Sequence, residues 1–150
     1  MGDDGKGGRG ALPFRFAGGT GYLLARAGAE SRRRWAAMLV EHGLTPYDYG
    51  VLLGLDELGA TGQGDLAARL GVDRRNMVAI VDRIVGRGLV ERRPHERDRR
   101  RRALVLTATG QGLARDLVEH GARLENELLA GLGARDRVTL RRLLLAVLDE

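Results

Sequence analysis

The sequence contains no cysteine, which excludes a disulfide framework, a thiol redox switch and a thiolate metal site. Aromatic residues make up only 4% of its 150 residues, so helices packed through leucine, valine and alanine are expected rather than aromatic-rich strands. No apolar run approaches the roughly 20 residues that a membrane-spanning helix needs, and the N-terminus lacks a signal-peptide core. We therefore expect a soluble, cytoplasmic protein without a membrane partner.

Lysine is nearly absent as well. Lys6 is the only one, so arginine supplies almost all the positive charge behind a formal net charge of +5. This charge favours an anionic partner such as nucleic acid, although a GC-rich genome also enriches arginine. Residues 1–12 are rich in glycine and carry charges of both signs, which predicts a disordered tail. Residues 13–150 are expected to form a single domain.

The chain is organised around residues 62–106. Two short apolar-periodic segments are joined there by a glycine-containing turn, and Asp73 suits the N-cap of the second segment. One strand is predicted to start at Leu89 and Val90 and another to span 103–106, with an arginine-rich loop between them. A helix-turn-helix followed by a basic β-hairpin describes a winged helix. The apolar stripe of the second helix is predicted to contain Val78, Val81, Ile84 and Val85.

Flanking this region, apolar periodicity predicts helices at 19–42, 45–58, 107–132 and 136–148. The sequence Thr45-Pro46-Tyr47-Asp48 has the order of an N-cap, a first-position proline and an acidic third residue. Thr107 is the predicted cap of the third of these helices. The last two helices carry more apolar residues than a winged-helix core of this size covers. They form either a monomeric helical layer or a surface for a second subunit.

Three motifs within this pattern resemble a known family. They are RGLVERR at residues 87–93, the DRR of the wing at 98–100, and Leu106-Thr107-x-x-Gly110 at the start of the next helix. Together they are similar to the multiple-antibiotic-resistance-regulator (MarR) family of bacterial transcription factors, over roughly residues 20–150. The resemblance implies a mainly α-helical winged helix-turn-helix fold with a small β-hairpin wing. It also implies a DNA-binding lobe at about 45–106 and dimerisation helices at about 19–42 and 107–150.

DNA recognition in such a fold requires side chains that reach base edges in the major groove. The first turn of the recognition helix offers Arg74, Arg75 and Asn76, of which arginine pairs with guanine and asparagine with adenine. The family usually has small hydroxyl residues near 75 and 76, so this chain is expected to read a different target. The full set of contacts predicted for this helix is Asp73, Arg74, Arg75, Asn76, Met77, Ala79 and Arg83.

The wing is the second predicted DNA contact, because arginine suits the negative potential of a narrow minor groove. By resemblance, Arg97 or Arg99 enters the groove, and Asp82 on the recognition helix pairs with a wing arginine such as Arg100. The predicted wing contacts are Arg93, Arg97, Asp98, Arg99 and Arg100. The predicted braces of the hairpin are Asp82, Asp98 and Arg100.

The resemblance further implies a homodimer and a small aromatic or phenolic effector. The predicted dimer interface contains Leu24, Leu128, Leu140, Leu144 and Val147. The predicted effector crevice contains Trp35, Met38, His42 and Tyr47, which ordinary core packing around a tryptophan explains equally well.

Catalysis finds no support in the sequence. The three histidines, His42, His95 and His120, lie in different predicted elements without metal-ligand spacing, and no phosphate loop or nucleophile motif is present. We expect no cofactor, no metal and no enzymatic activity. The predicted function is a DNA-binding transcriptional regulator, a homodimeric repressor released from a pseudo-palindromic operator by the effector. The alternative is a winged-helix protein-interaction adaptor without DNA binding.

Overall fold

The computed structural model describes residues 18–95 and 98–148; for His95 and residues 98–101 it describes the backbone alone. The elements, in chain order, are α1 (Thr20–Glu41), α2 (Pro46–Leu58), β1 (Thr61–Gly62), α3 (Gln63–Arg69), α4 (Arg74–Gly86), β2 (Val90–His95), β3 (Asp98–Leu106), α5 (Ala108–Leu128) and α6 (Ala134–Val147). None of the described helices is long and apolar enough to cross a membrane.

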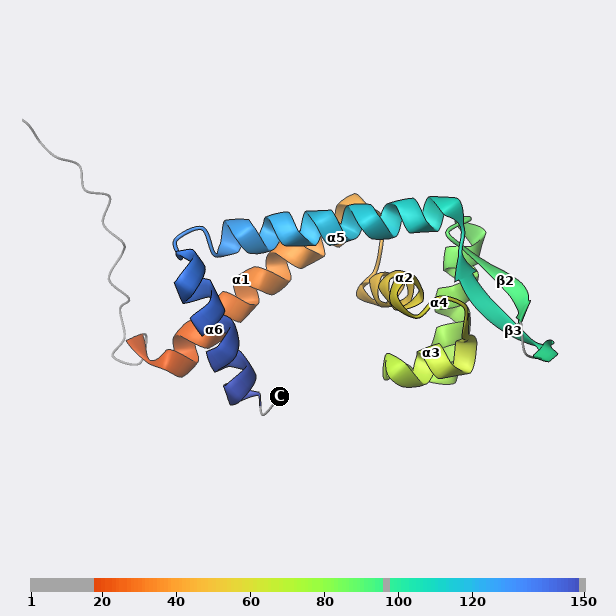
Figure 1. Cartoon of the computed structure of the whole chain (residues 1–150), viewed down its shortest axis with the longest axis horizontal. Helices are drawn as coiled ribbons and strands as arrows, with labels where there is room; N and C mark the ends of the chain where they lie inside the picture. The colour runs from red at the N-terminus through yellow and green to blue at the C-terminus, as the bar shows by residue number, and fades with distance from the viewer. Residues whose placement is uncertain (1–17, 96–97, 149–150) are drawn as a thin grey trace, which may run out of the picture.

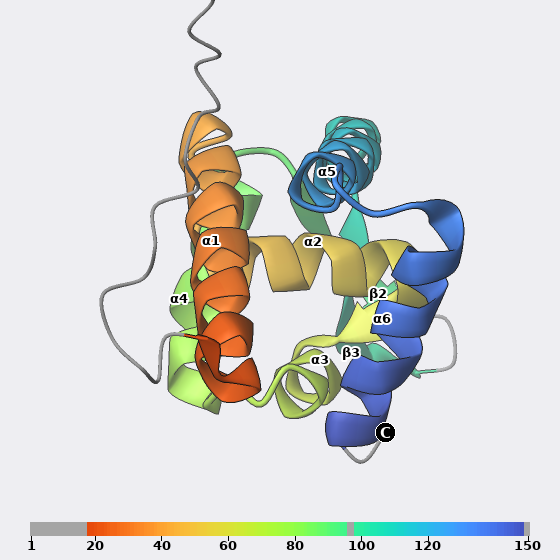
Figure 2. The ribbon, with the colours of Figure 1, turned by 90° about the vertical axis from the view of Figure 1, so that its left-hand side faces the viewer.

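The molecule is elongated along α5 (Figure 1). At one end of α5 lie α2, α3, α4 and the hairpin of β2 and β3, and at the other end lie α6 and the first part of α1. Seen along this long direction, α1 and α6 stand on opposite sides of the molecule (Figure 2). The winged-helix lobe therefore lies apart from α6 and the first part of α1, and few other elements of the chain pack against these two segments.

A three-stranded antiparallel sheet has the order β1-β3-β2. Val90 pairs with Leu106 at the base of the wing, and His95 pairs with Asp98 near its tip. The prediction of an arginine-rich loop between two short strands is wrong: β2 and β3 extend over most of this segment, with a register irregularity between Pro94 and His95. β1 was not predicted. Its two residues, Thr61 and Gly62, are too few to show any periodicity.

The core lies where α1, α2, α3, α4 and α5 meet the base of the sheet. Its largest fully buried side chains are Met38, Leu52, Leu66, Met77, Ile84, Leu104 and Leu117. One predicted core residue is misplaced, since Val78 is 46% exposed. On α4 the buried stripe follows Met77, Ile80, Val81 and Ile84, and Val78 lies about 100° around the helix from Met77.

The predicted helix starts are confirmed. Thr45 and Asp48 form a capping box at the start of α2, and the Asp73 carboxylate accepts the backbone N–H of Arg75 at 2.8 Å. Thr107 Oγ1 caps α5 by accepting the N–H of Gly110 at 3.0 Å. Near the C-terminus the bounds differ from those predicted. α5 ends at Leu128, and α6 begins at Ala134 after its cap, Gly133.

Candidate nucleic-acid interface

The first turn of α4 presents polar side chains to solvent. Arg74, Arg75 and Asn76 are all exposed, and the Asp73 cap fixes the backbone from which they project. Met77 and Ile80 hold α4 against the core, and Arg75 lies on the helix face opposite to this buried stripe.

Two apolar residues of α4, Met77 and Val78, lie in environments opposite to those predicted. Met77 was predicted to contact DNA, but it is buried in the core, so that prediction is wrong; it belongs to the same stripe as Ile80 and Val81. Val78 and Ala79 are exposed one residue further on. An exposed valine beside Arg74 and Arg75 can pack on the methyl group of thymine. Val78 was not among the predicted contacts, because its spacing on the helix predicted a core position.

Arg83 has a different environment from the one predicted. Its Nη2 lies 2.6 Å from Oδ1 of Asp48, and its Nε donates to the same oxygen at 3.2 Å. The guanidinium is therefore turned toward the start of α2. The prediction of Arg83 as a DNA contact conflicts with this geometry, and the sequence carried no signal for it, because Asp48 lies 35 residues away.

The wing is attached to α4 by an ion pair. Asp82 accepts from Nη2 of Arg92 on β2, and on the same strand Arg93 pairs with Glu91. Arg93 and Arg102 are exposed near the hairpin's base. The remaining wing residues predicted to contact DNA or brace the hairpin lie outside the described residues or have no described side chain: Arg97, Asp98, Arg99 and Arg100. Asp82 therefore pairs with a wing arginine, as predicted, and among the described side chains that arginine is Arg92.

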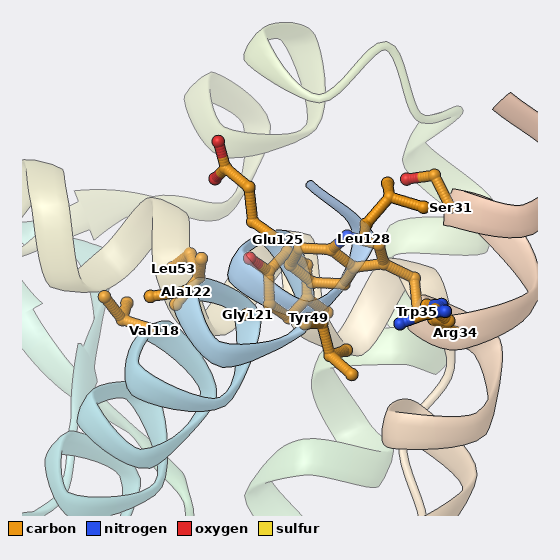
Figure 3. Close-up of a pocket in the computed structure, with 11 residues that line it drawn as sticks. Ser31, Arg34, Trp35, Tyr49, Leu53, Val118, Gly121, Ala122, Glu125 and Leu128 are labelled. Carbon is orange, nitrogen blue, oxygen red and sulfur yellow. The ribbon is translucent and has the colours of Figure 1, made fainter. Parts of the chain in front are cut away.

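An open cavity of about 520 Å³ lies between α1, α2 and α5 (Figure 3). Trp35 and Tyr49 meet edge to face in its wall, with ring centroids 4.9 Å apart. Burial raises the pKa of the Tyr49 hydroxyl. Arg34 lies at the cavity, bound to Glu30 at 2.8 Å and near Glu127 at 3.5 Å. The cavity thus combines an aromatic wall with a guanidinium that is paired with two carboxylates, and Glu125 also lines it.

The four residues predicted for an effector crevice are not brought together. Trp35 lines the cavity, but Met38 is fully buried in the core and Tyr47 is 58% exposed in the first turn of α2. His42 instead meets His120 of α5, with ring centroids 5.9 Å apart. The aromatic partner of Trp35 is Tyr49, since it lies two positions beyond Tyr47 and so faces α1 rather than solvent.

The residues predicted for the dimer interface lie on surfaces that the chain leaves partly open. Leu24 and Val147 are exposed, and α6 contains no buried residue. Leu128, Leu140 and Leu144 are half-buried. Other large apolar side chains exposed on α6 are Val138 and Leu143.

Among the residues that the structure describes, no three histidine, aspartate or glutamate side chains cluster in a way that would hold a metal ion. The pairing of His42 with His120 was not predicted, because it joins the end of α1 to the middle of α5. Two histidines alone lack the further ligands and the acidic partner that a metal or acid–base site needs.

Comparisons with known proteins agree with this geometry. The model of the MarR family matches residues 42–101 of the chain. Over 131 residues the chain is 33% identical to a protein of Thauera aromatica named "Putative transcriptional regulatory protein for hcr operon", covering 86% of this chain and 78% of that protein. It is 26% identical over 137 residues to the HTH-type transcriptional repressor NicR of Pseudomonas putida, covering 91% and 87% of the two chains.

Among solved structures, a MarR family protein of Mycobacterium tuberculosis in complex with DNA has a TM-score of 0.71 to this chain at 27% identity. The match covers 85% of this chain and 96% of that chain. The similarity therefore includes both the winged-helix lobe and the flanking helices.

Proposed function

This chain belongs to the MarR family of DNA-binding transcriptional regulators, and from that premise we propose that it is a homodimeric repressor of a pseudo-palindromic operator. The observation that carries the proposal is the first turn of α4, where Arg74, Arg75 and Asn76 are exposed and anchored from behind by the core. Bidentate pairing of arginine with guanine and of asparagine with adenine gives this turn a means of reading sequence.

The wing contributes the second contact in this proposal. Arg93 and Arg102 are exposed near its base, and Arg97 and Arg99 belong to the tip that we expect to enter the minor groove. The exposed Asp82–Arg92 ion pair joins the hairpin to α4, so we expect both elements to meet the same duplex. The DNA-binding lobe is proposed to span about residues 45–106. The proposed ligand is double-stranded DNA, and the proposed compartment is the cytoplasm.

Dimerisation follows from the helices outside the lobe, at about residues 19–42 and 107–150. α6 buries no residue in the monomer, and apolar side chains on α1 and α6 remain exposed. A second copy would cover these faces. It would also supply a second α4, which reading an inverted repeat requires.

The effector site that we propose is the cavity between α1, α2 and α5. A small aromatic carboxylate would lie against the Trp35 and Tyr49 side chains in the cavity wall, with its charge toward Arg34. A ligand in this cavity need not touch DNA. It releases the operator if it binds better to a dimer whose two α4 helices are wrongly spaced.

Selection from a random library of ~20-base-pair duplexes, a length that spans two half-sites, tests the proposal. Fluorescence anisotropy would then compare the selected duplex with a shuffled duplex of the same composition. We expect the selected duplex to bind on the order of 10³-fold more tightly or better at physiological salt. Equal affinities, or no binding to either duplex, would contradict the proposal and favour the adaptor function.

The effector site can be tested separately, because two ligands that bind one protein must change each other's affinity by the same factor. If benzoate, as the simplest aromatic carboxylate, weakens binding of the selected duplex, the duplex must weaken benzoate binding by the same factor. Trp35→Ala should remove both effects. Equal benzoate affinity in the free and DNA-bound protein would exclude this mechanism of release for that ligand.

A further inference from the structure

Two arginines one helical turn apart tie α4 to the corner between α1 and α2. Arg83 donates from Nη2 to Asp48 Oδ1 at 2.6 Å and to Thr45 Oγ1 at 3.3 Å. Arg87 donates from Nη1 to the carbonyl of Gly43 at 2.7 Å and from Nη2 to the carbonyl of His42 at 3.0 Å. The corner itself comprises residues 42–48. α4 thus has two separate side-chain attachments to it, in addition to its apolar face.

Asp48 is the centre of the first attachment. It is 1% exposed and is the one buried charged residue among those described. Its Oδ2 accepts the backbone N–H of Thr45 at 2.8 Å and the hydroxyl of Thr45 at 2.9 Å, while Oδ1 takes the guanidinium of Arg83. One carboxylate therefore completes the cap of α2 and holds α4. A buried carboxylate that lost its arginine would remain charged without a cationic partner, which is costly.

Arg87 performs the equivalent task at the end of α1. The last carbonyls of a helix have no partner within the helix and require donors from elsewhere. The guanidinium of Arg87 donates to the carbonyls of His42 and Gly43, which directly follow the last residue of α1, across 45 and 44 residues of sequence. The end of α1 and the start of α2 are consequently fixed to the same helix.

The helices α1 and α2 also line the cavity of about 520 Å³. Trp35 of α1 and Tyr49 of α2 line it, and Tyr49 directly follows Asp48 in the chain. We propose that Arg83 and Arg87 are positioning residues for DNA recognition: they set the orientation of α4 from the α1–α2 corner and transmit any displacement of that corner to α4. The inference rests on the proposed function, because it assumes that α4 reads DNA.

The competing role for Arg83 is a direct contact with a DNA phosphate, and the salt dependence of binding separates the two roles. Loss of one phosphate contact lowers the slope of log K against log salt by about one. Loss of a positioning contact lowers affinity for the selected duplex but leaves that slope unchanged. We therefore expect Arg83→Gln to weaken binding of the selected duplex roughly tenfold with an unchanged slope, an effect within the coupling range of residues in contact.

A double-mutant cycle gives the sharper test. Asp48→Asn preserves the shape of a buried side chain that cannot itself touch DNA, so a phosphate-contact role for Arg83 predicts no effect from it. If Arg83 is a positioning residue, Asp48→Asn, Arg83→Gln and the double variant should all lower the affinity for the selected duplex by the same factor. Arg75→Gln is the comparison on α4: because the orientation of α4 sets the contact that Arg75 makes, its loss of affinity should be smaller in the Asp48→Asn background than in the wild-type protein.

Circular dichroism and the thermal midpoint of each variant report whether it folds. If Asp48→Asn does not fold, Arg87→Gln replaces it, since the partners of Arg87 are backbone carbonyls and its side chain is exposed. The same loss of affinity with an unchanged slope is expected. Two results would overturn this inference without affecting the proposed function. One is a double variant of Asp48→Asn and Arg83→Gln whose loss of affinity equals the product of the two single losses. The other is a salt slope lowered by about one in Arg83→Gln. A wild-type protein that binds no selected duplex would overturn the proposed function as well.

Discussion

At Gly110 the chain passes so close to its own backbone that no side chain fits. A Cβ atom there would lie 1.9 Å from the carbonyl oxygen of Leu89. The contact arises because Thr107 joins the start of α5 to the turn after α4: its N–H donates to Leu89 at 3.1 Å and its hydroxyl donates to Gly88 at 2.7 Å. The Leu-Thr-x-x-Gly motif therefore has a steric explanation in this fold.

We predict that Gly110→Ala lowers the free energy of unfolding by at least about 2 kcal/mol, since it forces apart two hydrogen-bonded backbone segments. Gly112→Ala is the matched control on α5, because a Cβ at Gly112 meets nothing within 4 Å. It should leave stability unchanged or raise it by up to ~1 kcal/mol through helix propensity. Urea unfolding of both variants measures the difference. Equal stabilities would show that the motif does not depend on this close approach.

Asp48 predicts a pH dependence. Burial alone would raise the pKa of its carboxyl, but hydrogen bonds from Arg83 and Thr45 outweigh burial and place the pKa below its ordinary value of 3.8. A lowered pKa in the folded state contributes stability above the unfolded value, and this is lost as the pH falls toward the folded value. The stability difference between wild type and Asp48→Asn should therefore shrink below about pH 4. A difference that stays constant from pH 6 to pH 3, on the order of 3 pH units across the carboxyl range, would contradict this account.

At the scale of elements, α4 and the wing are expected to divide the work of recognition. Arg75→Ala or Asn76→Ala should relax base preference, costing about 1–3 kcal/mol of discrimination for each good bidentate contact. Arg93→Ala in the wing should weaken selected and shuffled duplexes alike and lower the salt slope by about one. Anisotropy titrations at several salt concentrations measure both effects. If Arg75→Ala weakened both duplexes equally, it would be a phosphate contact instead.

Helices and their starts were predictable because their signals are local. The apolar spacing of α4 and the caps at Thr45, Asp73 and Thr107 each lie within a few residues of the element that they define. β1 escaped prediction because it consists of two residues that pair with a distant strand, Thr61 with Leu104 and Gly62 with Ala103.

Side-chain partners across elements were not predictable from local spacing. Helical periodicity placed Tyr47 and Tyr49 on α2, but the packing of α1 decided that Tyr49 meets Trp35 and that Tyr47 faces solvent. In the same way, arginine is a residue type common in DNA contacts, but in the folded chain Arg83 pairs with Asp48 instead. Candidate contacts chosen by residue type alone therefore included residues that packing and ion pairing remove.

At the scale of the whole molecule, the exposed apolar faces of α1 and α6 predict dimerisation. Val147 is 66% exposed, so Val147→Asp should leave the fold of one chain intact. In a dimer interface the same unpaired charge would cost several kcal/mol and separate the subunits at micromolar concentration. Val40→Asp is the control, because Val40 is 75% exposed at the lobe end of α1, outside the predicted interface. Light scattering that finds monomeric wild-type protein would exclude the dimer.

The central claim is that two copies of α4 read successive major grooves on one face of a duplex. In a dimer these helices must be held about one helical turn apart, roughly 34 Å. The most direct measurement is the affinity of the wild-type protein for the selected duplex and for the same duplex with about five base pairs, half a turn, inserted between its half-sites. We predict that the insertion removes most of the preference over a shuffled duplex, because it rotates one half-site to the opposite face. Unchanged affinity would contradict the account.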